Sequence, residues 1–330
     1  MRWLITGGCG FIGRMLIRRL VDEGGHAIRV VDNLSVGQTD ALTAFTALTR
    51  EDAERPGPMA DTPGVTLIEA DIRDAAAMAR AVDGAQVIVH LAANTGVEPS
   101  VKDPMFDCES NVTGTLNMLE AARHAGTDTF VFASSGAPAG EVEPPIHEEL
   151  APHPVSPYGA SKLAGEGYCS AYARTFGVKT VCLRFGNVYG PGSTHKSSVV
   201  AKFIRRALAG EKLEIYGDGA QTRDYIFITD LVDAIVKAAT VPDVGGEVFQ
   251  IATAAETSVG EMVDKLLPVL EAHGVARPEV IHGAPRQGDV MRNYSDTSKA
   301  RRMLGWQATH DLDTGLPKTV AWFTTPAGDV

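Results

Sequence analysis

The chain has 330 residues and a formal net charge of −11 at pH 7, which argues against a surface for binding nucleic acid. It is long enough to bury a sizeable core without disulfides or structural metals. The four cysteines form no CxxC pair, so we expect reduced thiols, no metal site and a cytoplasmic location. They are Cys9, Cys108, Cys169 and Cys182. Hydropathy predicts neither a signal peptide nor a membrane span.

Short apolar runs alternate with longer amphipathic stretches through the first half of the chain. This alternation is typical of βαβ units and predicts an α/β fold with a Rossmann-type, doubly wound parallel sheet. Strands are expected at residues 3–5, 27–31, 65–69, 87–91, 129–133 and 178–185, and helices at 14–23 and 75–82.

A surface insertion is expected between about residues 39 and 64, which are rich in Ala, Thr and Pro. Two prolines, Pro56 and Pro58, make a continuous helix there unfavourable. We interpret the segment as a loop with a short helix, and a lid over a substrate is the alternative.

The alternation weakens after about Asn187, and helices are expected at 198–209, 230–239, 259–272 and 297–304. We assign residues 1–187 mainly to dinucleotide binding. Residues 188–330 are assigned mainly to a smaller C-terminal α/β substrate lobe, with some chain crossing back to the first domain. The loops of this lobe would lie above the strand ends, where open α/β sheets bind ligands. Asp230 is interpreted as a helix N-cap.

A glycine-rich turn follows the first expected strand and opens a helix. Gly7 allows the tight turn, Gly10 lets the backbone approach a pyrophosphate, and Gly13 permits close packing of helix on sheet. The helix N-terminus offers N–H donors to the phosphates. Asp32 ends the second strand, where a carboxylate can bind both ribose hydroxyls and would repel a 2′-phosphate. The turn therefore predicts a nicotinamide dinucleotide cofactor, NAD in preference to NADP.

Two further strand ends fit the same cofactor. Asp71 follows the strand at 65–69, where an adenine contact would fall, with an ordinary surface turn as the alternative. The segment His90-Leu91-Ala92-Ala93 ends the next strand with small residues, which leave room for a dinucleotide or simply pack tightly.

Tyr158 and Lys162 are four residues apart, which places both side chains on one face of a helix. A Lys ammonium together with a positive nicotinamide ring would lower the pKa of the tyrosine, so that its phenolate could remove a hydroxyl proton near neutral pH. Ser134 and Ser135 end the strand before this helix and should point hydroxyls at the same strand-end crevice. These residues predict redox chemistry on an alcohol.

The motifs together resemble the extended short-chain dehydrogenase/reductase superfamily, in its branch of nucleotide-sugar epimerases and dehydratases. The resemblance covers nearly the whole chain. The matching segments are TGGCGFIG, DNL, EADIRD, HLAA, NVTGTLNMLEAAR, SPYGASK, RFGNVYGPG, IYGDGAQTRDYIFITD and LGW.

The resemblance implies Ser135, Tyr158 and Lys162 as the catalytic residues. It implies NAD contacts at Gly7, Gly10, Phe11, Ile12, Gly13, Asp32, Asn33, Asp71, Ile72, Leu91, Ala92, Ala93, Asn111, Tyr158 and Lys162. It implies UDP-sugar contacts at Ser135, Asn187, Glu214, Tyr216, Arg223, Arg286 and Asp289. A homodimer is also implied, through the helices of Asn111 and Tyr158. The apolar faces of these helices are compatible with it, and packing inside the chain is the alternative role of their side chains, which are Leu116, Leu119, Leu163 and Tyr168.

The residues after Ser135 distinguish among the reactions of this branch. In the family that the chain resembles, dehydratases carry Thr-Asp-Glu and decarboxylases Thr-Ser-Glu at the end of this strand, whereas this chain has Ser135, Gly136 and Ala137. Without the acids, the simplest chemistry is C4 epimerisation through a 4-keto intermediate. A dehydratase, a decarboxylase, a dehydrogenase and a non-catalytic NAD-binding protein are the alternatives.

The identity of the sugar depends on a short basic segment, in which Thr194, His195 and Lys196 could face the C6 end. A basic side chain there would favour a uronate, so UDP-glucuronate and UDP-galacturonate form the leading pair. A solvated loop is the alternative for the segment. UDP-glucose/UDP-galactose and UDP-N-acetylhexosamines are the alternative substrates, and dTDP-sugars stay open. Three positions differ from the residues that are usual in this family, which suggests a pocket reshaped near the sugar. They are Cys9, Pro138-Ala139-Gly140 and Gly186.

Overall fold

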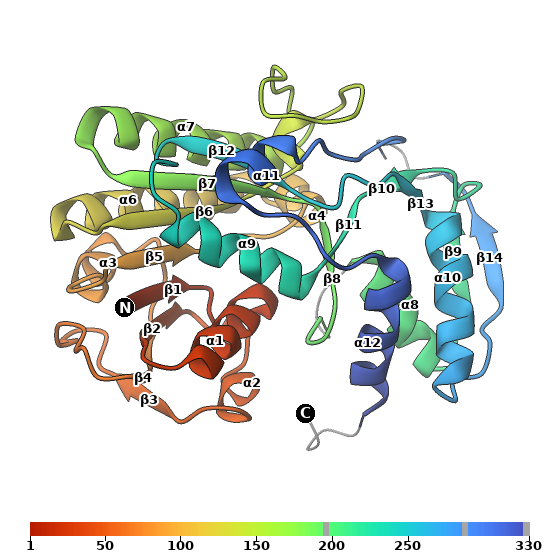
Figure 1. The fold of residues 1–330 in the computed structure, drawn as a ribbon, viewed down its shortest axis with the longest axis horizontal. Helices are drawn as coiled ribbons and strands as arrows, with labels where there is room; N and C mark the ends of the chain where they lie inside the picture. The colour runs from red at the N-terminus through yellow and green to blue at the C-terminus, as the bar shows by residue number, and fades with distance from the viewer. Residues whose placement is uncertain (194–197, 286–289, 326–330) are drawn as a thin grey trace. The chain divides into compact units, whose positions relative to one another are not determined.

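The computed structural model describes residues 1–193, 198–285 and 290–325 (Figure 1). The chain divides into two compact units. Unit 1 comprises Met1–Glu141, Leu150–Arg184 and Val232–Phe249, and unit 2 comprises Val142–Glu149, Phe185–Leu231 and Gln250–Val330. Within the described ranges we find no helix with the length and apolar character that crossing a membrane requires.

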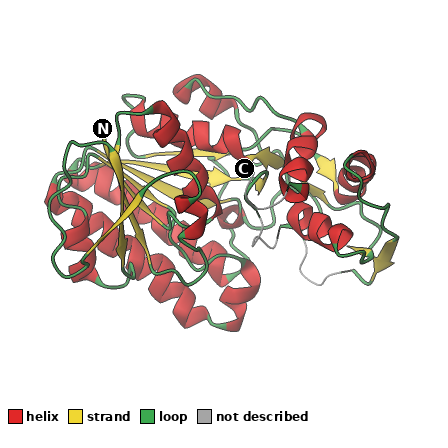
Figure 2. Cartoon of the chain, turned by 90° about the horizontal axis from the view of Figure 1, so that it is seen from below, coloured by secondary structure: helices red, strands yellow, loops and turns green. Residues whose placement is uncertain are grey.

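An eight-stranded sheet in the order β12-β7-β6-β5-β1-β2-β4-β3 takes its strands from residues 2 to 251 of the chain. From β1 the order extends outward in both directions, and β1 pairs in parallel with both β2 and β5. Helices lie on both faces of these strands (Figure 2). The predicted α/β fold with a doubly wound Rossmann-type sheet is confirmed. The strands are β1 Arg2–Thr6, β2 Ala27–Asp32, β3 Leu48–Glu51, β4 Gly64–Glu69, β5 Val87–His90, β6 Thr129–Ser135, β7 Lys179–Phe185 and β12 Glu247–Ile251.

Local sequence signals explain where the helices begin and end. Ser156 caps the helix that carries Tyr158 by accepting from the N–H of Gly159, Pro157 occupies its first turn, and Gly177 ends it in the left-handed conformation. The helices are α1 Phe11–Glu23, α2 Asp40–Thr43, α3 Ala75–Ala81, α4 Val97–Lys102, α5 Pro104–Cys108, α6 Gly114–Ala125, α7 Pro157–Phe176 and α9 Ile228–Thr240, with a π-helix at Glu109–Thr113 and a 3₁₀ turn at Ala137–Ala139.

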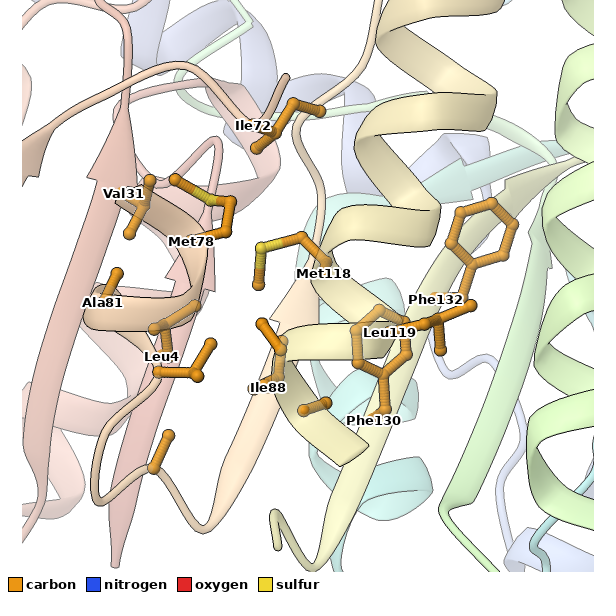
Figure 3. Packing of buried hydrophobic residues seen from close by; sticks show 14 of the residues in the cluster. Leu4, Val31, Ile72, Met78, Ala81, Ile88, Met118, Leu119, Phe130 and Phe132 are labelled. Carbon is orange, nitrogen blue, oxygen red and sulfur yellow. The ribbon is translucent and has the colours of Figure 1, made fainter. Parts of the chain in front are cut away.

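The core of unit 1 fills the space between the sheet and helices α3 and α6. Met78 of α3 and Met118 of α6 face one another there, above Leu4 and Ile88 of the strands (Figure 3). Leu119 is fully buried in this same cluster. Packing inside the chain, the alternative role for this side chain, therefore accounts for Leu119. Tyr168 on α7, by contrast, is 39% exposed.

The insertion at 39–64 contains the expected short helix, α2, but it also contains an edge strand that the sequence did not indicate. Strand β3 pairs in parallel with β4. Arg29, a buried arginine of β2, holds the segment in place: it donates to Glu51 Oε2 at 2.8 Å, to the Gly57 carbonyl at 2.7 Å and to the Ala81 carbonyl at 3.0 Å. Polar anchoring thus orders a strand that has no apolar pattern.

Unit 2 carries two-stranded pairings and four helices among its described residues. Strands β8 and β11 pair in parallel, as do β9 and β14, and β10 pairs with β13 in the antiparallel sense. The strands are β8 Asn187–Tyr189, β9 Leu213–Tyr216, β10 Thr222–Arg223, β11 Tyr225–Phe227, β13 Thr257–Ser258 and β14 Val280–Gly283. The helices are α8 Val199–Leu208, α10 Val259–Ala272, α11 Ser298–Leu304 and α12 Leu312–Thr324. The helices expected at 198–209 and 297–304 correspond to α8 and α11, and the observed bounds differ from the expected ones by at most one residue.

Asp230 does not cap a helix, contrary to expectation. Helix α9 begins at Ile228, so Asp230 lies within its first turn. Its carboxylate instead accepts from the backbone N–H groups of Thr309 and His310, at 2.9 and 2.8 Å, and from the Thr309 hydroxyl at 2.7 Å. The Trp306 indole donates to the Asp230 carbonyl at 2.9 Å. Asp230 therefore fastens the 306–310 segment to α9.

Candidate active site

The glycine turn between β1 and α1 has the close contacts that only glycine allows. Gly7 has φ +68°, and a Cβ there would lie 2.8 Å from the Ala92 nitrogen. A Cβ on Gly13 would lie 2.5 Å from the Gly7 carbonyl oxygen. Gly10, the N-cap of α1, differs: an added Cβ would meet only the Gly7 oxygen, at 3.2 Å. The backbone is therefore accessible at Gly10, where a pyrophosphate would approach the helix N-terminus.

Asp32 ends β2 beside this turn and is itself buried. Its Oδ2 accepts from the Cys9 N–H and its Oδ1 from the Leu34 N–H, each at 2.9 Å. Burial raises the pKa of Asp32, and the two backbone hydrogen bonds oppose that rise. Each carboxylate oxygen retains acceptor capacity for a ribose hydroxyl. The turn and Asp32 thus fit a dinucleotide.

Asp71 and Asn33, both predicted cofactor contacts, come together in the structure. Asn33 Nδ2 donates to Asp71 Oδ2 at 3.0 Å. Arg73, which sequence reasoning missed, donates to both oxygens of Asp71, and its side-chain hydrogen bond is the main reason that the pKa of Asp71 falls to about 2. The Arg73 guanidinium also lies 4.9 Å from the centre of the Phe106 ring.

The ends of β5 and α1 hold the remaining predicted cofactor residues. Leu91 and Ala92 follow β5, and their N–H groups bond to the Thr6 carbonyl and hydroxyl, both at 3.2 Å. Phe11 and Ile12 open α1, and Ala93 precedes the Asn94 amide that bonds to Asn111. Ile72 packs against the Gly114 backbone, where an added Cβ would lie 2.7 Å from it.

Asn111 lies in the π-helical segment between α5 and α6, a feature with no sequence signal. Its Nδ2 donates to the Asn94 carbonyl at 3.0 Å, to Asp107 Oδ1 at 3.0 Å and to Ser161 Oγ at 3.1 Å. Its Oδ1 accepts from the Asn94 N–H at 2.8 Å. The Ser161 hydroxyl donates to the Tyr158 carbonyl at 3.0 Å. The network therefore connects the end of β5 to the start of α7.

A second buried chain of hydrogen bonds runs beneath Asn111. The Thr115 hydroxyl donates to the Asn111 carbonyl at 2.6 Å, so it accepts from His90 Nε2, 3.2 Å away. His90 Nδ1 then accepts from the Thr6 hydroxyl at 2.8 Å. Burial lowers the pKa of His90 to about 3, and the nearby Lys162 charge adds to this effect. The imidazole is therefore neutral and links the glycine turn to the π-helix.

Ser135, Tyr158 and Lys162 are brought together at the end of β6. The Ser135 hydroxyl lies near enough to the Tyr158 phenol to act on its pKa, which it lowers. Ser135 Oγ also accepts from the Ala137 N–H at 3.2 Å. Lys162 Nζ donates to the Ala133 carbonyl at 2.9 Å and lies 6.0 Å from the centre of the Tyr158 ring. A hydroxyl, a phenol and an ammonium thus lie together at this strand end, where Lys162 is buried and Ser135 and Tyr158 are half-buried.

The ionisation of this cluster differs from the sequence-based expectation for the protein chain itself. Burial raises the pKa of Tyr158 to about 12, although the Ser135 hydrogen bond opposes the rise. Burial likewise lowers the pKa of Lys162 to about 8. The expectation that Lys162 and a positive nicotinamide ring together lower the tyrosine pKa concerns the cofactor-bound protein, whereas in the protein chain alone desolvation dominates both groups.

The segment after Ser135 forms a 3₁₀ turn at Ala137–Ala139 and carries no acid. Glu166 and Asp107 are the buried carboxylates of the surrounding helices α7 and α5. Glu166 is paired with Arg184, whose Nε and Nη2 donate to it at 2.8 and 2.7 Å. Gly136 and Ala137 thus occupy the start of this 3₁₀ turn, at the positions where dehydratases carry their acids.

The predicted nucleotide contacts of unit 2 lie on its short strands. Asn187 begins β8, Glu214 and Tyr216 lie on β9, and Arg223 ends β10. Arg223 Nη1 donates to the carbonyls of Thr222 and Val290 at 2.6 and 2.7 Å. The other predicted contacts, Thr194, His195, Lys196, Arg286 and Asp289, lie outside the described residues.

Asp224 is a residue of this region that sequence reasoning missed. Its buried carboxylate accepts from the Thr253 N–H and hydroxyl at 2.7 and 2.6 Å, from the Ala254 N–H at 3.0 Å and from the Ser295 N–H at 3.3 Å. Its carbonyl accepts from the Asn187 N–H at 2.8 Å. Asp224 therefore fixes the backbone on either side of Arg223 and Asn187.

The parallel sheet, glycine turn and Ser–Tyr–Lys cluster define a dinucleotide-dependent enzyme of the Rossmann type. Residues 3–252 match the model of the NAD dependent epimerase/dehydratase family, and the chain belongs to this family. The resemblance noted in the sequence is thereby confirmed, and NAD is the cofactor of the family.

Individual relatives match over almost the full length. The chain is 38% identical to a UDP-glucose 4-epimerase of Mycolicibacterium smegmatis, covering 98% of each chain. It resembles the structure of the UDP-glucose 4-epimerase of Thermotoga maritima with UDP-glucose, at 34% identity and a TM-score of 0.86, covering 98% of each chain. It also resembles the UDP-glucuronic acid 4-epimerase of Bacillus cereus in complex with UDP-glucuronic acid and NAD, at 28% identity and a TM-score of 0.84, again covering 98% of each.

Proposed function

We propose that the protein interconverts the C4 epimers of a UDP-sugar. The observation that carries the proposal is the cluster of Ser135, Tyr158 and Lys162 at the end of β6, in a chain of the NAD dependent epimerase/dehydratase family. Similarity to UDP-sugar 4-epimerases along the whole chain supports it.

In the proposed reaction Tyr158 removes the proton of the C4 hydroxyl, and Ser135 hydrogen bonds to the same oxygen. When bound, NAD supplies the acceptor and later the donor of the C4 hydride. The Lys162 ammonium stabilises the negative charge of the phenolate. After the ketone turns over, Tyr158 returns its proton to the C4 oxygen, so the substrate gains and loses nothing.

Epimerisation is favoured over dehydration by the chemistry of the strand end. Elimination of water needs further acid and base groups beside the sugar, and Gly136 and Ala137 supply neither. Glu166 is held by Arg184 and by the Ser134 hydroxyl, so it is not available as a replacement.

Binding of the cofactor is proposed for the predicted contacts of unit 1, within the first 187 residues. The glycine turn, Asp32 and the Asn33–Asp71 pair would hold the adenosine and pyrophosphate. Asn187, Glu214, Tyr216 and Arg223 are proposed for the nucleotide of the substrate, with Arg286 and Asp289 beside the diphosphate.

For the sugar, our proposal is the pair UDP-glucuronate and UDP-galacturonate, because His195 and Lys196 could pair with a C6 carboxylate. UDP-glucose and UDP-galactose form the second candidate pair, favoured by the 38% identity to a UDP-glucose 4-epimerase. Both pairs require the same C4 chemistry from Tyr158.

The test is to incubate the purified protein with a panel of UDP-glucuronate, UDP-glucose, UDP-N-acetylglucosamine and dTDP-glucose, followed by epimer-resolving NMR. We expect a C4 epimer from a UDP-sugar without net consumption of NAD. Tyr158→Phe should reduce turnover by about 10²- to 10⁴-fold while the fold is kept. Accumulation of NADH in proportion to product, or loss of water or carbon dioxide from the sugar, would refute the proposal.

A homodimer is proposed through α6 and α7. Exposed apolar side chains on α5 and α7 support it, since Met105 is 70%, Tyr168 39% and Phe176 48% exposed. Light scattering on the purified protein should give about twice the mass of one chain, and a monomer at micromolar concentration would refute this proposal.

A further inference from the structure

Asp107 is a buried carboxylate that the proposed reaction does not use. It lies on α5, four residues before Asn111, and is 1% exposed. Oδ1 accepts from Asn111 Nδ2 at 3.0 Å and from Asn94 Nδ2 at 3.3 Å. Among the described residues, Oδ2 is buried without a hydrogen-bond partner. A buried carboxylate oxygen left without a donor is costly, so another group should compensate for it.

Whereas Asp107 has an acceptor without a donor in the described ranges, Lys162 is a buried cation with hydrogen-bond donors to spare. Its side chain is buried, with the residue 3% exposed, and Nζ donates to the Ala133 carbonyl. An ammonium carries three N–H donors, and in the described part of the chain the Ala133 carbonyl is the one acceptor that we find for Nζ. The two groups lie on neighbouring helices that Asn111 joins, because its Nδ2 donates both to Asp107 Oδ1 and to the hydroxyl of Ser161, the residue before Lys162. The Asp107 charge accordingly acts to raise the pKa of Lys162.

We propose that Asp107 is a positioning residue that serves as the buried counter-ion of Lys162 and keeps the lysine as an ammonium beside Tyr158. The inference rests on the proposed function for its catalytic consequence, but the ionic relationship can be measured without turnover. Asp107 would act through Lys162 and would not itself touch the substrate.

The groups that face Lys162 from each neighbouring element show why a counter-ion is needed. Strand β6 contributes the Ala133 carbonyl and the Phe132 ring, whose centre lies 4.9 Å from Nζ. Strand β5 contributes His90, which is neutral at working pH because its pKa is about 3. Helix α7 contributes Tyr158, Glu166 and Cys169, and α5 contributes Asp107.

Of the acids in this set, Glu166 is already neutralised. It forms a bidentate pair with Arg184 and also accepts from the Ser134 hydroxyl at 2.5 Å. Among the groups just named, Lys162 is the one cation that faces Asp107. After burial, the charge of Asp107 is the largest influence on the pKa of Lys162. Asp107 is therefore the carboxylate that opposes the loss of the proton from Lys162.

The same charge has a cost at Tyr158, where Asp107 acts to raise the pKa of the phenol. This influence ranks below burial and the Ser135 hydrogen bond, whereas at Lys162 it ranks second after burial. Loss of the carboxylate should therefore affect the ammonium more than the phenol. At neutral pH a larger fraction of Lys162 would then be neutral, and a neutral lysine does not stabilise phenolate.

The direct test is the titration of Lys162 by NMR of protein labelled at lysine Cε, with its signal assigned from Lys162→Met. In the unaltered protein we expect Lys162 to titrate above neutral pH. In Asp107→Asn, which keeps the shape of the side chain, its midpoint should move to lower pH by about one unit or more. Asp128→Asn is the matched control, because Asp128 is exposed and its loss removes the same formal charge.

Unchanged titration of Lys162 in folded Asp107→Asn would overturn the proposal. So would a Lys162 that is already neutral at pH 7 in the unaltered protein, a result that needs no variant to fold. Either outcome stands whether or not the protein turns over any sugar.

The pH profile of kcat connects the assignment to the reaction. In Asp107→Asn the fall of kcat at high pH should begin about one unit lower than in the unaltered protein and in Asp128→Asn. Failure to epimerise any UDP-sugar, with the NMR shift present, would reject the proposed function and keep the counter-ion. Epimerisation with an unshifted titration and profile would reject the counter-ion and keep the function.

Discussion

Glu166 and Arg184 form a bidentate ion pair in the interior of unit 1, with both side chains 5% exposed. Glu166 lies four residues after Lys162 on α7, Arg184 lies on β7, and the Ser134 hydroxyl of β6 donates to the same carboxylate. The pair therefore fixes the helix that carries Tyr158 and Lys162 to the two strands beside it.

Removing one member of this pair should strongly destabilise the protein. Glu166→Gln removes the carboxylate charge that faces the buried Arg184 guanidinium at 2.7 and 2.8 Å, and we expect it to lower the free energy of unfolding by about 3–5 kcal/mol. Urea unfolding followed by circular dichroism measures the change. Lys212→Met is the control: it removes an exposed pair with Glu279, and its effect should stay within about 1 kcal/mol. Similar small losses in both variants would contradict the prediction.

Substitution in the glycine turn should weaken the cofactor site without unfolding the protein. In Gly13→Ala the added Cβ would lie 2.5 Å from both the Gly7 oxygen and the Gly8 Cα, so the backbone of the turn must shift. A loss of only about 1.4 kcal/mol of binding weakens Kd tenfold, and we expect at least that for NAD.

The measurement is NAD affinity by calorimetry on cofactor-free protein. Gly260→Ala gives the matched comparison, since a Cβ there would meet its nearest neighbours at ordinary distances of 3.6 and 3.9 Å. Its NAD affinity should equal that of the unaltered protein. If Gly13→Ala also binds NAD normally, the close contacts at Gly13 do not shape the cofactor site.

The sequence predicts those elements of the fold that have a regular pattern of apolar residues or glycines. The strands of the sheet and the glycine turn are visible because apolar runs and glycines repeat at fixed spacings. Strand β3 is Leu-Thr-Arg-Glu and depends on the buried Arg29, so no hydrophobic pattern predicts it. The sequence predicts Asp230 as a helix N-cap, yet its carboxylate accepts tertiary hydrogen bonds from Thr309 and His310.

In the candidate site, too, local patterns predict some features and tertiary contacts determine the others. Tyr158 and Lys162 are recognisable from their spacing, and Ser135 from the strand before them. Burial decides their pKa values, and burial depends on contacts from α5 and the π-helix that no local pattern encodes. The spacing of four between Asp107 and Asn111 was the one signal that could have brought Asp107 into the site.

The buried histidine should make stability depend on acidic pH. The pKa of His90 is about 3 in the folded protein, below its ordinary value of about 6.5, so the unfolded chain binds more protons between these values. Stability from the neutral imidazole is therefore complete above pH 6.5 and is lost as the pH falls towards 3. Between pH 7 and pH 5 the loss is about 2 kcal/mol.

His90→Gln removes this titration while it retains one donor and one acceptor. The free energies of unfolding at pH 7 and pH 5 should then differ by about 2 kcal/mol less than in the unaltered protein. Urea titrations at the two pH values give both numbers. An equal acid sensitivity in the two proteins would show that His90 does not stay neutral in the folded state.

Cysteine reactivity should follow burial site by site. Cys108 is exposed, whereas Cys9, Cys169 and Cys182 are buried. Burial raises the pKa of Cys9 to about 12, and a hydrogen bond with Cys169 and burial both raise the pKa of Cys182. Because the thiolate is the reactive form, iodoacetamide at pH 8 should rapidly modify one cysteine of the native protein, Cys108.

Mass spectrometry of intact protein counts the modified thiols. The native protein should gain one carbamidomethyl group quickly, Cys108→Ser none, and the urea-unfolded chain four. Rapid modification of Cys9 in the native protein would contradict the structure of the glycine turn, because its thiol is enclosed where the Cys9 N–H bonds to Asp32. Protection of Cys108 that ends on dilution would instead indicate that a second copy of the chain covers α5.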